Sequence, residues 1–253
     1  MKLTIVGCSG SFPGPDSPAS CYLLEAPYDG RTYRLLLDLG NGALGHLQRY
    51  VDPLDVDAVA LSHLHADHFF DLASFYVYRR YHPKAPHPRI PVLGPRGTAS
   101  RLARAYDLTE QPGMTEEFDF ATWPPEGVVE VGPFEVRVRR VAHPVEAYGM
   151  RISADSSVLA YSGDTGPCSQ LESLAAEADV LLAEAAFVES VEHPTDLHLT
   201  GRDAAEHATR AGVRRLLLTH IPPWHDAAEV LADARPAFDG PLELVHAGAT
   251  YEL

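Results

Sequence analysis

The sequence predicts an α/β (α+β) protein in which two β-sheets pack against each other and helices cover the outside of the sandwich. Short apolar segments rich in leucine and β-branched residues occur in two groups, one in each half of the chain. Segments with helical periodicity follow each group. Sheets and helices of this kind bury their apolar faces by stacking in layers. With 253 residues, 45% of them hydrophobic, and no linker-like segment, the chain is expected to form one domain over residues 1–253.

The first sixty residues are expected to form a β-meander, because Gly, Pro and Asp turns separate four short apolar segments. These segments are KLTIVG, CYLLEAP, RLLLDLG and DAVALSH. From Asp67 the apolar spacing becomes helical through FFDLASFYVYRRY. A second helix is predicted in RGTASRLARAYDL, beginning near Gly97.

The second half of the chain begins with strands predicted in FEVRVRRVAH and GMRISADSSVLAYSGD, with a polar turn at residues 155–157. A helix, a strand, a helix and a strand follow in SQLESLAAEA, DVLLAEA, TGRDAAEHATRAG and VRRLLLTH. Thr200 is predicted to cap the second of these helices, with Asp203 three residues on and Gly212 as its C-terminal stop. A helix in DAAEVLADARPAF and a closing strand pair complete the chain.

Composition argues against a membrane protein and against a protein that binds polyanions. No apolar run approaches the roughly 18 to 20 residues that span a bilayer, and MKLTIVGCSGSFPG lacks the apolar core of a signal peptide. Three cysteines without a C-x-x-C pair suit a reducing compartment, so we expect a soluble cytoplasmic protein. A net charge of −15 repels polyanions unless a local basic patch overrides it. The best candidate patch, YVYRRYHPKAPHPR, is either an exposed helix end and loop or a flap that meets an anionic substrate.

The segment LSHLHADHFFDL carries a cluster of side chains that bind metals well. His63, His65, Asp67 and His68 follow the pattern H-x-H-x-D-H, at the point where a predicted strand gives way to a helix. Imidazole and carboxylate ligands together suit zinc, manganese or iron better than calcium or magnesium. Four such groups in six residues exceed what one open tetrahedral ion takes from a single segment, which indicates two ions.

Three further candidate ligands each close a strand-like segment. They are His143 in RRVAHP, Asp164 in LAYSGDTG and His220 in LLLTHIPP. Loops at the ends of neighbouring strands lie at one edge of the sheets, so we expect these side chains to meet the first cluster there.

With these motifs the sequence resembles the metallo-β-lactamase superfamily over nearly its whole length. The resemblance implies a four-layer αββα sandwich with a binuclear metal site at one sheet edge. It further implies two divalent ions per chain, zinc first and manganese or iron as alternatives. In that family pattern His63, His65 and His143 would hold one ion, Asp67, His68 and His220 the second, and Asp164 would bridge them.

Within the superfamily, the segment DLHLTGRDAAEHATRAGVRRLLLTHIPP is similar to the RNase Z-like phosphodiesterases. It places His198 in an H-x-T motif, and DVLLAEAAF would bring Glu184 close to His198. GCSGSFPG and Asp38 in LLLDLGNG also fit that group. RNase Z enzymes that mature transfer RNA carry a long arm between the third and fourth metal motifs, but Asp164 follows His143 by only 21 residues. The missing arm and the acidic charge argue against a bulky RNA substrate.

The resemblance therefore points to an armless branch that hydrolyses small phosphodiesters, most of all cyclic nucleotides, by attack of a metal-activated hydroxide on phosphorus. Asp67 would orient or deprotonate the water, and His198, held by Glu184, would protonate the leaving group. Thr200 and Tyr148 are the candidate substrate contacts, and Trp224 either stacks on a base or packs at the rim. The alternatives are a transfer-RNA 3′-end endoribonuclease, a lactone or thioester hydrolase, and a metal carrier without catalysis. Family relatives make a homodimer the expected assembly.

Overall fold

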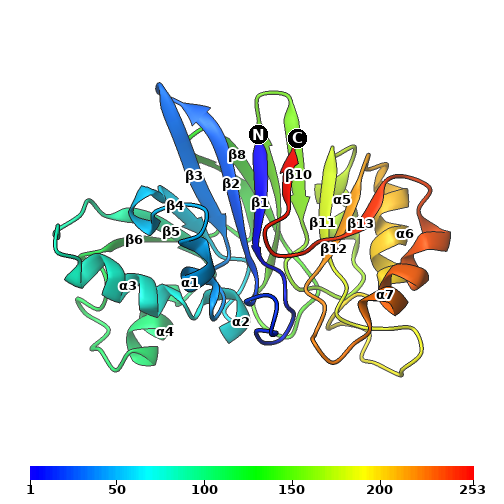
Figure 1. Ribbon diagram of the computed structural model, residues 1–253, viewed down its shortest axis with the longest axis horizontal. Helices are drawn as coiled ribbons and strands as arrows, with labels where there is room; N and C mark the ends of the chain where they lie inside the picture. The colour runs from blue at the N-terminus through cyan, green and yellow to red at the C-terminus, as the bar shows by residue number, and fades with distance from the viewer.

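The computed structural model describes residues 1–253 and contains two seven-stranded sheets that form the centre of the molecule (Figure 1). Strand order is β14-β1-β2-β3-β4-β5-β6 in the first sheet and β13-β12-β11-β10-β9-β8-β7 in the second. Helices α3 and α4 flank the first sheet, and α5, α6 and α7 flank the second (Figure 1). The predicted αββα sandwich is confirmed. None of the helices has the length and apolar character needed to cross a membrane.

The first sheet begins as the predicted meander and then departs from it. Its strands are β1 (Lys2–Gly7), β2 (Cys21–Tyr28), β3 (Arg31–Leu37), β4 (Ala58–Ala60), β5 (Ile90–Gly94), β6 (Phe118–Thr122) and β14 (Thr250–Glu252). Strands β1 to β3 are antiparallel neighbours, whereas β4 pairs parallel to β3. The reason is the crossover made by α1 (Ala43–Leu47) and the 3₁₀ turn η1 (Pro53–Asp55), which returns the chain to the same end of the sheet.

The second sheet is antiparallel through its first four strands and parallel afterwards. Its strands are β7 (Glu126–Val131), β8 (Phe134–Arg140), β9 (Tyr148–Ala154), β10 (Ser157–Tyr161), β11 (Val180–Glu184), β12 (Leu216–Thr219) and β13 (Leu242–Leu244). The prediction that the last two strands pair with each other is wrong. Strand β13 pairs parallel to β12, while β14 crosses to the other sheet and pairs antiparallel to β1.

The remaining helices lie close to their predicted places. They are α2 (Ala66–Phe69), α3 (Leu72–Tyr81), α4 (Thr98–Ala105), α5 (Ser169–Ala175), α6 (Gly201–Ala211) and α7 (Ala227–Ala234), with a 3₁₀ turn η2 (Arg235–Ala237) after α7. The predicted cap of α6 is confirmed: Thr200 Oγ1 accepts a hydrogen bond from Asp203 N at 3.0 Å, and Asp203 Oδ2 accepts one from Thr200 N at 3.1 Å. Gly212 ends the helix with φ +67°.

Side-chain alternation along the strands divides the core into one cluster for each interface between layers. In β3, Leu35 and Leu37 point into the space between the two sheets, whereas Leu36 points to the helices outside. In β11 and β12, Leu182 and Leu217 join the inter-sheet cluster, and their neighbours pack under α5, α6 and α7. Because the strands are fixed on both faces, the loops at their carboxyl ends are held on a rigid scaffold.

Candidate metal centre

The seven predicted ligand side chains lie together at the carboxyl-end edge of the sheets. His63 and His65 occupy the turn between β4 and α2, and Asp67 and His68 lie in the short helix α2. The other three follow strands β8, β10 and β12; they are His143, Asp164 and His220. Their ligand atoms fall into two groups, in each of which all atoms lie within 4.8 Å of one another.

The first group contains three imidazoles and one carboxylate. His65 Nδ1 lies 3.0 Å from His63 Nε2 and 3.2 Å from His143 Nε2. Asp164 Oδ2 lies 3.7 Å from His63 Nε2. Ligands about 2.0–2.1 Å from a tetrahedral zinc ion stand about 3.3 Å apart, which is close to these separations.

The second group uses two carboxylates and two imidazoles. His220 Nε2 lies 3.1 Å from both His68 Nε2 and Asp67 Oδ2. Asp164 takes part again, but through its other oxygen, because Oδ1 lies 3.2 Å from His68 Nε2. One carboxylate thus presents a separate oxygen to each group.

The chemistry of this donor set fits divalent metal ions. His63, His68, Asp164 and His220 are buried, and Asp164 Oδ1 has no hydrogen-bond partner. Burial lowers the pKa of His63 well below its usual range and also lowers the pKa values of His65 and His143, which favours neutral imidazoles with free lone pairs in the first group. In the second group the carboxylates of Asp164 and Asp38 outweigh burial and raise the pKa of His68. Buried lone pairs that converge without donors are costly unless a cation lies among them.

Asp38 holds one of the imidazoles in place. It follows β3 in the left-handed region, with φ +59°, and is fully buried. His68 Nδ1 donates to its Oδ2 at 2.8 Å, which leaves His68 Nε2 directed at the cluster. Ser62 donates from both its backbone N and its hydroxyl, each at 2.7 Å, and the Tyr161 hydroxyl donates at 2.6 Å.

The positioning role of Asp38 was not among the predicted site functions. A lone aspartate after a buried strand, in LLLDLGNG, was the available signal. His143 is oriented in a different way, because its Nδ1 donates to the Leu197 carbonyl at 2.9 Å. Every residue has a backbone carbonyl, so the residue types in the sequence do not show which carbonyl accepts this hydrogen bond.

His198 and Glu184 form the hydrogen-bonded pair that the sequence suggests. His198 Nδ1 lies 2.8 Å from Glu184 Oε1, and the His198 ring centroid lies 5.5 Å from that of His143 and 5.6 Å from that of His220. Glu184 is itself fixed by the backbone N–H groups of Thr165 and Ala186. Burial alone would lower the pKa of His198, but the carboxylates of Glu184 and Asp164 outweigh burial and raise it to about 9.

The two predicted substrate contacts lie inside the protein. Thr200 is fully buried, and its hydroxyl is engaged in capping α6. Tyr148 is 1% exposed, and its hydroxyl donates to Glu146 Oε1 at 2.9 Å. Neither side chain has the exposure that a substrate contact requires, so these positions give the two predicted contacts no support.

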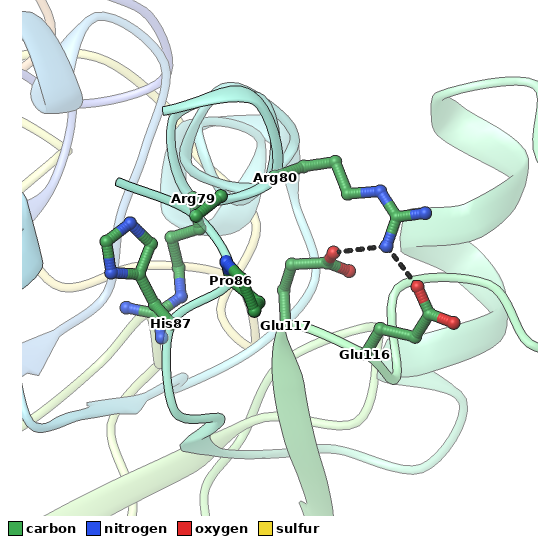
Figure 2. Close-up of a pocket in the computed structure, with 7 residues that line it drawn as sticks. Arg79, Arg80, Pro86, His87, Glu116 and Glu117 are labelled. Carbon is green, nitrogen blue, oxygen red and sulfur yellow. Dashed lines mark hydrogen bonds and ion pairs between the residues drawn. The ribbon is translucent and has the colours of Figure 1, made fainter. Parts of the chain in front are cut away.

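Two arginines of the basic segment at the end of α3, Arg79 and Arg80, are engaged by neighbouring groups of the protein. Figure 2 shows Arg80 extended toward Glu117 and Glu116; its Nη1 donates to Glu117 Oε1 at 2.9 Å and also contacts the Glu116 carboxylate. Arg79 is buried against Phe75, and its guanidinium donates to the Pro88 carbonyl. These contacts favour the interpretation of the segment as a helix end and loop over its interpretation as a flap that binds an anionic substrate.

Comparison with known proteins places the chain in a family. Residues 33–221 match the family described as "Beta-lactamase superfamily domain". Protein Rv1339 of Mycobacterium tuberculosis is 48% identical over 256 residues, which cover 100% of this chain and 92% of the relative. Ribonuclease Z of Mycolicibacterium gilvum is 32% identical over 252 residues, which cover 88% of this chain and 85% of the relative.

A solved structure agrees in fold over the whole chain. The metallo-β-lactamase fold protein YhfI of Bacillus subtilis, also described as a probable metallo-hydrolase, has a TM-score of 0.88 and 27% identity, covering 100% of this chain and 99% of that chain. With its αββα layers, its His/Asp groups at one sheet edge and a family match over most of its length, the chain belongs to the metallo-β-lactamase superfamily.

Proposed function

We propose that this protein is a metal-dependent phosphodiesterase that hydrolyses small phosphodiesters, with cyclic nucleotides of the cAMP type as its main substrates. The observation that carries the proposal is the His198–Glu184 pair beside the two His/Asp groups. Hydrolysis of a phosphodiester releases an alkoxide that needs a proton, and a partly buried imidazolium can supply it. Relatives described as a probable metallo-hydrolase and as a ribonuclease Z support hydrolysis in general.

The two groups of side chains define the proposed ligand sets for two ions, with zinc first and manganese or iron as alternatives. Each set combines imidazoles with a share of Asp164: His63, His65 and His143 for one ion, and Asp67, His68 and His220 for the other. Divalent ions bound there would lower the pKa of water and neutralise charge on the phosphoryl oxygens.

The chain's own side chains would handle the protons. Asp67 Oδ2 lies 3.1 Å from His220 Nε2 within the second ligand group, so Oδ1 would remain to accept a hydrogen bond from the attacking water and orient it. The hydrogen bond from Nδ1 to Glu184 leaves His198 Nε2 to donate to a phosphoryl oxygen and then to protonate the leaving oxygen. Glu184 would keep His198 in its charged form, since the carboxylates beside it raise the pKa of His198 to about 9.

The shape of the chain near the site supports a small substrate. The segment between His143 and Asp164 folds as the β9–β10 hairpin, with a tight turn at Asp155, and carries no protruding arm. The net charge of −15 opposes binding of a long polyanion. A second candidate, a transfer-RNA 3′-end endoribonuclease, is favoured by the similarity to a ribonuclease Z.

The first experiment is metal analysis of the purified protein, together with hydrolysis of 3′,5′- and 2′,3′-cyclic nucleotides, a transfer-RNA precursor and a lactone panel. We expect about two ions per chain, cleavage of cyclic nucleotides and an untouched precursor. Cleavage of the precursor alone would favour the endoribonuclease. Two ions without phosphodiester cleavage would favour the lactone hydrolase or the carrier. Sedimentation equilibrium on the same sample checks the proposed homodimer.

His198→Ala tests the assignment of the proton donor. Loss of a positioned general acid should lower kcat about 10²- to 10⁴-fold while metal content stays unchanged. His246→Ala is the matched control, because His246 is exposed and outside both groups. If His198→Ala loses metal but keeps its turnover per bound ion, the proton-donor role is wrong.

A further inference from the structure

The two tryptophans of this chain lie in opposite environments. Trp123 is 2% exposed, and its indole N–H donates to the Leu61 carbonyl at 2.9 Å. Trp224 is 62% exposed and lies against Phe12, itself 39% exposed, with ring centroids 4.9 Å apart and planes inclined by 41°. Leaving two large apolar rings in water is unfavourable, and an exposed aromatic pair of this kind indicates a binding surface.

Both rings are carried by loops that touch the predicted ligand His220. The backbone N of His220 donates to the Cys8 carbonyl at 3.0 Å, and Gly10 N donates to the Ile221 carbonyl at 3.1 Å. A Cβ atom at Gly10 would lie 2.1 Å from the His220 carbonyl oxygen, so only glycine permits this close approach. Phe12 follows Gly10 by two residues and Trp224 follows His220 by four, so no more than about 14 Å of extended chain separates Trp224 from this predicted ligand.

The loops that carry the pair are held by short-range contacts. The Ser9 hydroxyl donates to the Phe12 carbonyl at 2.7 Å, and Phe12 N donates to the Gly10 carbonyl at 2.7 Å. On the other loop, His225 N donates to the Pro222 carbonyl at 3.0 Å and closes a turn around Trp224. Because the loops already hold both rings in place, binding of a ligand to them costs the protein little conformational entropy.

We propose that Phe12 and Trp224 form a stacking surface for the base of a nucleotide substrate whose phosphodiester lies at the metal centre. This inference rests on the proposed function and adds a binding surface for the base, the part of the substrate that would give selectivity. Aromatic side chains stack on bases of any sequence because every base has a π face. A second protein chain is a poorer occupant, since stable interfaces bury about 800 Å² per partner and the two rings together supply about 300–500 Å².

A purine base should therefore bind better than a pyrimidine base, and a base-free ribose phosphate should bind least well. The selectivity would come from stacking area and not from hydrogen bonds to the base edge. Because the pair lies apart from the seven predicted ligands, its removal should act on substrate binding more than on the chemical step.

Hydrolysis of cAMP and of ribose 3′,5′-cyclic phosphate tests the inference in Trp224→Ala, Phe12→Ala and Trp224→Phe. For cAMP, Trp224→Ala should raise KM about 5- to 150-fold, which corresponds to about 1–3 kcal/mol for one stacked base. KM for the base-free substrate should stay nearly unchanged, because it has no base to stack, and Trp224→Phe should recover most of the cAMP affinity. Tyr81→Ala is the control, because Tyr81 is 68% exposed but lies at the end of α3.

A binding measurement separates this inference from the proposed activity. Titration with AMP should quench the fluorescence of Trp224 in the wild-type protein, ribose 5-phosphate should not, and Trp224→Phe should show no AMP-dependent quenching. Equal losses for both cyclic substrates, together with no quenching, would overturn the stacking surface while leaving the phosphodiesterase intact. Quenching by AMP in a protein that hydrolyses no phosphodiester would support the surface and refute the activity. Conversion of a dimer to monomers by Trp224→Ala would show that a second copy covers the pair, which would also overturn the inference.

Discussion

Replacing Asp38 by asparagine should weaken metal binding although Asp38 is not a ligand. Its carboxylate is fully buried and accepts hydrogen bonds from His68 Nδ1, from Ser62 and from the Tyr161 hydroxyl. Asparagine has nearly the same shape and tolerates the left-handed backbone at this position. It differs because it carries an NH₂ group in place of one oxygen and has no charge. Both oxygens of Asp38 accept hydrogen bonds, so in either amide orientation the NH₂ group would face another donor.

The expected size of the effect follows from these contacts. Loss of a partner that orients a ligating histidine typically costs about 10- to 100-fold in metal affinity, or about 1.4–2.7 kcal/mol. A hydrogen bond to a charged group contributes about 1.5–3 kcal/mol, so the unfolding free energy should fall by a similar amount. Tyr161→Phe removes one of these hydrogen bonds and keeps the carboxylate that orients His68, so it should lower the unfolding free energy by about 1.5–3 kcal/mol with little effect on metal affinity.

Metal affinity can be measured by competition with a fluorescent chelator, and stability by urea unfolding of the same samples. Asp38→Asn should lose affinity about 10- to 100-fold, and Tyr161→Phe should stay within a few-fold of the wild type. If Asp38→Asn folds with native near-ultraviolet circular dichroism and binds zinc as tightly as the wild type, Asp38 does not position the centre.

Two further predictions concern the metal ions and the proton donor. Removal of the ions with a chelator should abolish hydrolysis and lower Tm. An ion present at about 1,000 times its Kd contributes about 4.1 kcal/mol, or roughly 8–16 °C for a chain of this size, and calorimetry with and without added zinc checks this. An unchanged Tm would mean that the His/Asp groups hold no ion. Glu184→Gln removes a negative charge that helps raise the pKa of His198 to about 9, so the alkaline limb of the kcat profile should move to lower pH. A limb that stays in place would mean that His198 is not the titrating acid.

The ligand residues could be identified from the sequence because their signal is local. Four of them lie within six residues, and each of the others directly follows an apolar strand segment, as His220 does in LLLTHIPP. The contacts that orient them are not local. The Leu197 carbonyl, which accepts a hydrogen bond from the His143 ring, lies 54 positions away in the sequence. Tyr161 lies 123 positions from Asp38, to which its hydroxyl donates. Such pairs exist only after the two sheets have packed.

The same distinction between local and long-range contacts explains which parts of the fold could be predicted from the sequence. Helix caps such as that of Thr200 depend on three or four neighbouring residues, and they were predicted correctly. The pairing of β13 and β14 was not, because β14 finds its partner at the other end of the chain, in β1. The basic segment also needed the structure, since only packing shows that Arg79 is buried and that Arg80 is neutralised by Glu117.

The location of the metal centre ties it to the packing of the whole sandwich. Each group takes two ligands from loops of the first sheet and two from loops of the second, and Asp164 belongs to both groups. Gly163 permits this placement, because a Cβ there would lie 2.8 Å from the Tyr148 carbonyl oxygen and 3.0 Å from Ser62 Cβ. Ions bound to these groups would join the two sheets at the edge where Ser62 O accepts a hydrogen bond from Tyr148 N. Separation of the sheets would then require loss of the ions, so metal binding should stabilise the global fold and not only the loops that contain the ligands.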